Sequence, residues 1–170
     1  MNDDFAPIIN GCRRRDPRAQ RELYDRLAPM AMGVCMRYTH SRDDAQDLVQ
    51  DTFVKVFENL HKLKKNESVG AWVYQICVNI CINHVGRKLK TMRLDDAGIE
   101  PVIFQLDPFT VDEVVEAMQK LPPVQRLAFN MVEIEGYPQE EAARKMKITH
   151  SSLRSNLSRA KQRLRELLEK

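Results

Sequence analysis

Apolar residues recur every three or four positions along most of this chain, and this spacing is typical of helices that bury one face. The segment 42–60 shows the pattern most clearly, with the apolar side chains Leu48, Val49, Phe53, Val56, Phe57 and Leu60. Only 6 Gly and 8 Pro occur in 170 residues, too few for a fold built on many tight turns. We therefore predict an all-α fold.

Capping signals indicate where individual helices begin. Pro17 follows the potential N-cap Asp16, and Thr149 precedes the last apolar stripe. Thr110 and Glu113 have the spacing of a capping box. The predicted helices span about 4–14, 17–39, 42–60, 69–91, 110–121, 123–135, 138–147 and 150–169.

Residues 94–109 interrupt the helical pattern. They contain four acidic residues, no basic residue, and the prolines Pro101 and Pro108. We predict a flexible linker here, joining a four-helix domain over residues 1–93 to a smaller helical domain over residues 110–170.

Charge is distributed unevenly, although the net charge is only +3. Residues 144–170 carry nine Lys and Arg against two acids, whereas residues 107–141 carry eight acids against two Lys and Arg. This asymmetry indicates a surface that binds nucleic acid beside a surface with a different partner.

The four cysteines fall within apolar helical patterns rather than in loops, at Cys12, Cys35, Cys77 and Cys81. This placement favours reduced thiols in a cytoplasmic protein. The first residues are acidic and no apolar segment follows them, so we expect no signal peptide. The longest uncharged run, 68–86, contains three amides and a histidine, which argues against a membrane span.

The last predicted helix has two different faces on a helical wheel. Its narrow apolar stripe consists of Leu153, Leu157, Ala160, Leu164 and Leu167. The opposite face carries hydroxyls and arginines, which can bind phosphates and base edges of duplex DNA. Together with the short helix 138–147, this segment has the organisation of a helix-turn-helix. A solvated basic helix without a DNA partner is the alternative.

The predicted helix 69–91 carries a polar seam on an otherwise apolar surface. The seam consists of Gln75, Asn79, Asn83, Arg87 and Lys90, with Trp72 beside them. Amides suit base edges and an indole can stack on an unpaired base, so this seam is a candidate surface for single-stranded nucleic acid. The alternative is that the amides are buried and satisfy neighbouring backbone groups.

Three acidic residues, Asp44, Asp47 and Asp51, share one face of the predicted helix 42–60. DNA would repel this face, so we expect a protein partner there. The alternative is that the acids only complement the helix dipole.

Cys77 and Cys81 have a spacing that could bind a metal ion, with His84 close by in the sequence. They lie among apolar residues, however, and a fourth ligand is not evident. We predict a packed pair of core side chains, and we expect no metal, no cofactor and no catalytic group.

Three stretches of the sequence together resemble one family, the bacterial RNA polymerase sigma factors. The most characteristic region of that family resembles DAQDLVQDTFVKVFENL (44–60) and AWVYQICVNICINHV (71–85). Its C-terminal promoter-binding domain resembles LPPVQRLAFNMVEIEGYPQEEAARKMKITHSSLRSNLSRAKQRLREL (121–167). The short length and direct succession of these regions are similar to the extracytoplasmic-function (ECF) subfamily.

The resemblance implies an alternative sigma factor, which is not itself an enzyme but binds core RNA polymerase and directs promoter-specific initiation of transcription. It implies contact with the clamp helices of core polymerase through Asp44, Asp47, Gln50 and Asp51. It implies melting and binding of the −10 promoter element through Asn66, Ser68, Trp72, Gln75, Asn79, Asn83 and Arg87. It implies binding of the −35 element as duplex through Thr149, Ser151, Arg154, Ser155, Asn156, Ser158 and Arg159.

The same resemblance implies an anti-sigma factor that holds the protein inactive, a cytoplasmic location, no membrane partner, and a monomer in the free state. This sequence departs from the usual pattern of the family at Lys65, Gln75, Pro138 and Lys147, and we expect these departures to affect promoter preference.

Two other functions fit parts of the sequence. A stand-alone helix-turn-helix regulator would bind duplex DNA without polymerase and would leave the acidic face and the polar seam without a role. A small thiol or metal enzyme would use Cys77, Cys81 and His84.

Overall fold

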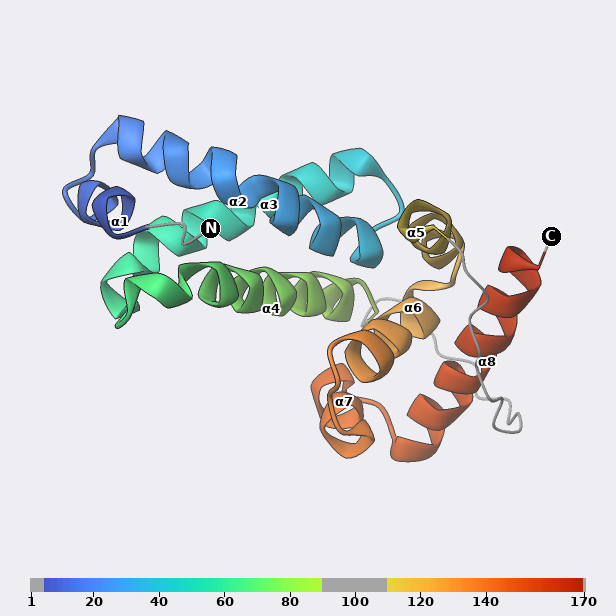
Figure 1. The fold of residues 1–170 in the computed structure, drawn as a ribbon. Helices are drawn as coiled ribbons and strands as arrows, with labels where there is room; N and C mark the ends of the chain where they lie inside the picture. Colours follow the sequence, from blue (N-terminus) through green and yellow to red (C-terminus); the bar gives the residue numbers. More distant parts are fainter. Residues whose placement is uncertain (1–4, 90–109, 170) are drawn as a thin grey trace. The chain divides into compact units, whose positions relative to one another are not determined.

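The computed structural model describes residues 5–89 and 110–169, apart from the side chains of residues 67, 88 and 89. All regular structure in these two ranges is helical (Figure 1). The predicted linker 94–109 lies outside them, and so do Lys90 and the predicted end of the fourth helix. The chain divides into two compact units, residues 1–36 with 41–81 and residues 37–40 with 82–170.

Four helices form the N-terminal part of the chain. They are α1 (Ala6–Arg13), α2 (Pro17–Tyr38), α3 (Arg42–Asn59) and α4 (Val69–Leu89). Two short 3₁₀ turns, Leu60–Lys62 and Asn66–Ser68, connect α3 to α4. These helices confirm the four that the apolar spacing predicts in this region.

Helix α3 illustrates why these segments are helical. Ser41 is its N-cap, and the Ser41 hydroxyl accepts a hydrogen bond from the Asp44 amide at 3.1 Å. The predicted stripe is buried at Leu48, Val49, Phe53, Val56 and Leu60. The rings of Tyr24 on α2 and Phe53 on α3 pack at a centroid distance of 4.6 Å, which joins the two helices in one core.

The C-terminal part contains α5 (Val111–Gln119), α6 (Pro123–Phe129), α7 (Gln139–Met146) and α8 (His150–Leu168). Thr110 and Glu113 form the predicted capping box. The residues after α6 continue as a π-helical turn, Asn130–Ile134, which the sequence pattern did not predict. Gly136 then ends this segment at the positive φ of +72°.

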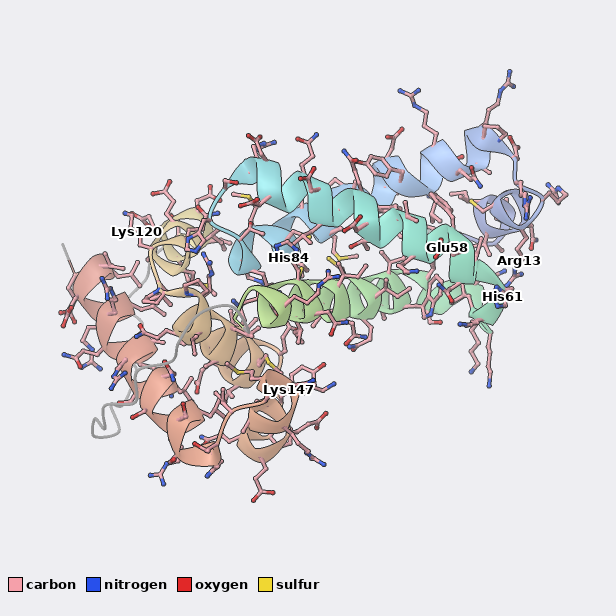
Figure 2. All side chains as sticks on the ribbon, turned by 180° about the vertical axis from the view of Figure 1, so that it is seen from behind. Arg13, Glu58, His61, His84, Lys120 and Lys147 are labelled. Atoms are coloured by element: carbon pink, nitrogen blue, oxygen red, sulfur yellow. The ribbon has the colours of Figure 1, made fainter. Side chains whose placement is uncertain are left out.

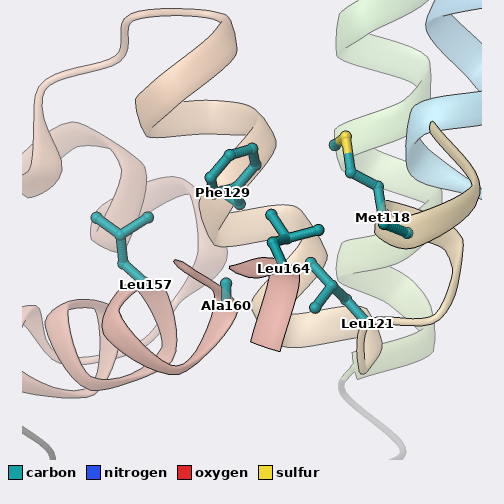
Figure 3. Close-up of a cluster of buried hydrophobic side chains, with 7 residues drawn as sticks. Met118, Leu121, Phe129, Leu157, Ala160 and Leu164 are labelled. Carbon is teal, nitrogen blue, oxygen red and sulfur yellow. The ribbon is translucent and has the colours of Figure 1, made fainter. Parts of the chain in front are cut away.

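One apolar cluster holds the second group of helices together (Figure 3). It contains Ala117, Met118, Leu121, Phe129, Leu157, Ala160 and Leu164. These side chains come from α5, the turn after it, α6 and α8, so burying them fixes α8 on its neighbours. Removing a large side chain of this kind costs about 2–5 kcal/mol.

The turn between α7 and α8, where Figure 2 labels Lys147, has the backbone hydrogen bonds of a Schellman motif. The Ile148 amide donates to the Ala143 carbonyl at 3.1 Å, and the Lys147 amide donates to the Arg144 carbonyl at 3.2 Å. Lys147 itself is left-handed, with φ 57° and ψ 38°. This confirms that the chain places a lysine where helix-turn-helix proteins favour glycine.

Candidate functional site

The first turns of α8 present a polar surface. Thr149 is the N-cap, and its hydroxyl accepts a hydrogen bond from the Ser152 amide at 3.1 Å. Thr149, Ser151 and Arg154 are exposed, and Ser155 is half-buried. These hydroxyls and the guanidinium therefore lie at the positive end of the helix dipole, where a phosphate is favoured.

Three other predicted residues of α8 are less accessible. Asn156 and Ser158 are only 7% and 6% exposed, and Arg159 is half-buried. The Asn156 amide donates to the Ser152 carbonyl at 2.9 Å. Because α5, α6 and α7 all pack against α8, its buried surface is wider than the leucine stripe on the helical wheel. Burial therefore disfavours direct contact of Asn156 and Ser158 with DNA.

The polar seam of α4 is exposed. Gln75, Asn79, Asn83 and Arg87 all lie on the surface, each one helical turn from the next. Gln75 donates a 3.5 Å hydrogen bond to Asn79, at the limit of hydrogen-bond distance. The alternative of buried amides is therefore wrong for these positions. The amide edges are accessible to a ligand.

The residues before α4, together with the first turn of α4, add a half-buried ring and several cations. Asn66 and Trp72 are half-buried, whereas Ser68 is exposed and its hydroxyl donates to the Lys65 carbonyl at 2.8 Å. A salt-sensitive surface is expected here because three lysines are exposed beside these residues, at Lys62, Lys64 and Lys65.

A hydrogen bond from α1 holds this connection in place. The Arg13 guanidinium donates to the Leu63 carbonyl at 2.9 Å, and the Leu63 side chain is buried. Figure 2 labels Arg13 beside Glu58 and His61, at the end of α3 that leads into the connection. The lysines thus extend from an anchored segment rather than from a free loop.

The acidic face of α3 is accessible. Asp47, Gln50 and Asp51 are exposed, and Asp44 is half-buried. Within the described residues, neither Asp47 nor Asp51 takes part in an ion pair. Their carboxylates are therefore available to a basic or polar protein surface.

The structure adds an apolar residue to this face. Val54 is 55% exposed, and it lies about one turn beyond Asp51 and two turns beyond Asp47 on the same side of α3. A valine surrounded by exposed acids is a candidate contact at the centre of a protein interface. The sequence analysis missed Val54, although a helical wheel separates it from the buried stripe of α3.

The cysteine pair is buried, as predicted. Cys77 and Cys81 are both 0% exposed, and Cys35 from α2 joins them. Sequence spacing does not reveal this third thiol, because Cys35 is 42 residues away from Cys77.

Comparisons with known proteins match both parts of the chain. The family model for Sigma-70 region 2 matches residues 23–91, and the model for Sigma-70, region 4 matches residues 112–164. The chain belongs to the sigma-70 family, in its ECF subfamily. As a sigma factor it directs promoter-specific initiation of transcription.

Individual relatives resemble this sigma factor over most of its length. The RNA polymerase sigma-H factor of Pseudomonas aeruginosa is 25% identical over 178 aligned positions, which cover 95% of this chain and 92% of the relative. The ECF RNA polymerase sigma factor SigM of Mycobacterium tuberculosis is 28% identical over 133 aligned positions, which cover 76% of this chain and 67% of the relative.

A solved structure has a similar fold. It is the sigma factor RpoE of Bartonella quintana in complex with the anti-sigma factor NepR, with a TM-score of 0.51 and 24% identity over 88% of this chain and 96% of that one. No helix within the described ranges is long and apolar enough to cross a membrane.

Proposed function

We propose that this ECF sigma factor uses three separate surfaces during initiation. The acidic face of α3 binds the clamp helices of core polymerase, the seam of α4 binds the melted −10 element, and the start of α8 binds the −35 element as duplex. The observation that carries this proposal is the chemistry of the three exposed surfaces. Acids and Val54 suit a protein, amides beside Trp72 suit unpaired bases, and hydroxyls with Arg154 suit duplex DNA.

The α4 surface has what strand melting requires. Unstacking a base costs a few kcal/mol, and stacking on an aromatic ring returns about 1–3 kcal/mol per base. Trp72 provides the ring, while Gln75, Asn79 and Asn83 provide donors and acceptors for base edges. The lysines before α4 supply sequence-independent attraction to phosphates.

The α8 surface suits duplex recognition. We assign direct contacts to Thr149, Ser151, Arg154 and Ser155, which are the accessible members of the predicted set. Asn156 contributes to DNA binding indirectly, because its side-chain amide donates a hydrogen bond to the Ser152 carbonyl in the first turn of α8. Arg159 and Ser158 lie beyond this turn and contribute less.

The protein acts as a dissociable subunit and not as an enzyme. Its place of action is the cytoplasm, where polymerase and promoter meet, and it is a monomer when free. An anti-sigma factor keeps it inactive by covering its exposed surfaces. The Bartonella quintana relative in complex with NepR supports this mode of regulation.

Co-elution with core polymerase on gel filtration tests the proposal. We expect the wild-type chain to co-elute and Asp47→Lys/Asp51→Lys to elute alone, because two negative charges on the α3 face become positive, a change of four units in net charge. The matched control is Glu22→Lys/Asp25→Lys, which makes the same charge change at exposed positions of α2 and should still co-elute.

A promoter selected by the wild-type holoenzyme separates the two DNA surfaces. Arg154→Ala should weaken binding to the intact duplex, whereas Asn79→Ala/Asn83→Ala should reduce strand opening and leave duplex binding unchanged. If wild-type protein binds duplex DNA but forms no complex with active core polymerase, a stand-alone helix-turn-helix regulator is the better account.

A further inference from the structure

Three thiols meet inside the first unit, and the transcription mechanism uses none of them. The Cys35 sulfur on α2 lies 3.5 Å from that of Cys77 and 3.8 Å from that of Cys81, both on α4. All three sulfurs lie within 4.8 Å of one another. Each side chain is 0% exposed, so the cluster is closed to solvent.

We propose that Cys35, Cys77 and Cys81 form a binding site for one monovalent copper ion, Cu(I). The separations support this, because a point equidistant from three sulfurs at these distances lies about 2.4 Å or less from each, and metal–thiolate bonds are about 2.3 Å long. The three sulfurs are therefore close to a coordination triangle before any metal enters.

The number of ligands selects the metal. Zn²⁺ in structural sites takes four ligands in a tetrahedron. Among the described His, Cys, Asp and Glu residues, only these three gather here. Cu(I) is a soft ion that thiolates bind preferentially, and it needs no fourth ligand. The three cysteine side chains are each 0% exposed, so solvent water does not reach the sulfurs to complete the shell.

Protonation distinguishes metal binding from thiol oxidation. Hydrogen bonds with Cys35 and Cys77, together with burial, raise the pKa of the Cys81 thiol. A buried, protonated thiol is a poor nucleophile, so attack on a peroxide is disfavoured. A metal ion instead displaces the protons. The balanced step is Cu(I) plus two thiols giving a Cu(I) dithiolate and two protons, with the third sulfur as a neutral ligand.

Binding at this site links two helices of the promoter-melting unit. Cys35 belongs to α2, and Cys77 and Cys81 belong to α4, the helix that carries the polar seam. Because folding brings the three sulfurs together, the folded chain binds the metal more tightly than the unfolded chain does, and the metal therefore raises the thermal stability of this unit. The inference rests on the sulfur cluster alone and does not depend on the proposed function.

An anaerobic competition titration tests the site. The full-length chain is mixed with Cu(I) and a chromogenic Cu(I) chelator, and the copper withheld from the chelator is measured. We expect one Cu(I) per chain for the wild type and a loss of at least tenfold in affinity for Cys35→Ala or Cys77→Ala. Cys12→Ala is the matched control, because Cys12 is a buried cysteine outside the cluster, and it should retain full affinity.

Two further readouts keep the test decisive if an alanine variant unfolds. X-ray absorption of the copper-loaded wild type should show two or three sulfur neighbours at about 2.3 Å. Affinity should rise about a hundredfold per pH unit, because two protons are released for each ion. Four results would each overturn the proposal. They are nitrogen or oxygen neighbours of the copper, a Cu(I) affinity that does not depend on pH, the same Cu(I) affinity in the triple variant Cys35→Ala/Cys77→Ala/Cys81→Ala as in the wild type, and tighter retention of Zn²⁺ than of Cu(I).

Discussion

Lys147 offers a direct test of how the turn before α8 is held. Its φ of 57° is left-handed, which costs a residue with a Cβ roughly 1–2 kcal/mol. Lys147→Gly removes that cost but increases the entropy of the unfolded chain, which offsets about 0.4–1 kcal/mol. The Schellman hydrogen bonds use only backbone atoms and remain. We therefore expect a net stabilisation of about 0.5–1 kcal/mol.

Hydrogen exchange of the amides in α7 and α8 is the suitable assay, because it reports on the second unit separately from the first. A gain of about 0.5–1 kcal/mol should slow exchange about 2- to 5-fold there and leave α2 and α3 unchanged. Lys147→Ala is the control, because it removes the charge but keeps the Cβ, so it should give no such gain. Equal slowing in both variants would refute the backbone explanation.

Four more predictions follow from the surroundings of single residues. Gly11→Ala should destabilise the protein by about 1–3 kcal/mol in thermal or urea unfolding, because the new Cβ would lie 2.5 Å from the Cβ of Ala19. Gly33→Ala in α2 should instead stabilise the protein by about 0.5–1 kcal/mol, because the new Cβ would have no atom within 4 Å apart from the nearby backbone of its own helix. The hydrogen bonds of Thr110 lower the pKa of Glu113, so the stability of α5 should be complete above the ordinary pKa of 4.5 and fall as the pH drops through the lowered value. Hydrogen exchange across acid pH checks this, and Glu113→Gln should lack that pH dependence. Val54→Asp should weaken co-elution with core polymerase without changing the melting temperature, since the side chain is 55% exposed; unchanged co-elution would remove Val54 from the interface.

Helix boundaries could be predicted from sequence because they depend on neighbouring residues. Ser41, Thr110 and Thr149 each cap the helix that follows, and each accepts a hydrogen bond from an amide three residues later. The left-handed conformation of Lys147 likewise depends on the residues next to it in the sequence. The polar seam also lies on a single helix, so the four-residue spacing of its members was enough to predict that they line one side of α4.

Features that depend on contacts between helices could not be predicted in this way. The burial of Asn156 and Ser158 depends on how several helices pack against α8. The meeting of Cys35 with Cys77 depends on how α2 and α4 pack. The π-helical turn at 130–134 is likewise absent from the apolar spacing. A wheel assigns side chains to faces, but it does not say how many neighbours each face has.

The exposed seam of α4 also limits how a nucleic acid strand can lie on it. Each step of four residues advances the helix by about 6 Å and turns it about 40° past a full circle. Gln75 and Arg87 are three such steps apart, so they point in directions about 120° different. A strand that follows the seam crosses α4 obliquely, at about 26° to its axis. Its two ends then face different sides of the helix, so under the proposed function we expect edge recognition only for the few bases near Asn79 and Asn83.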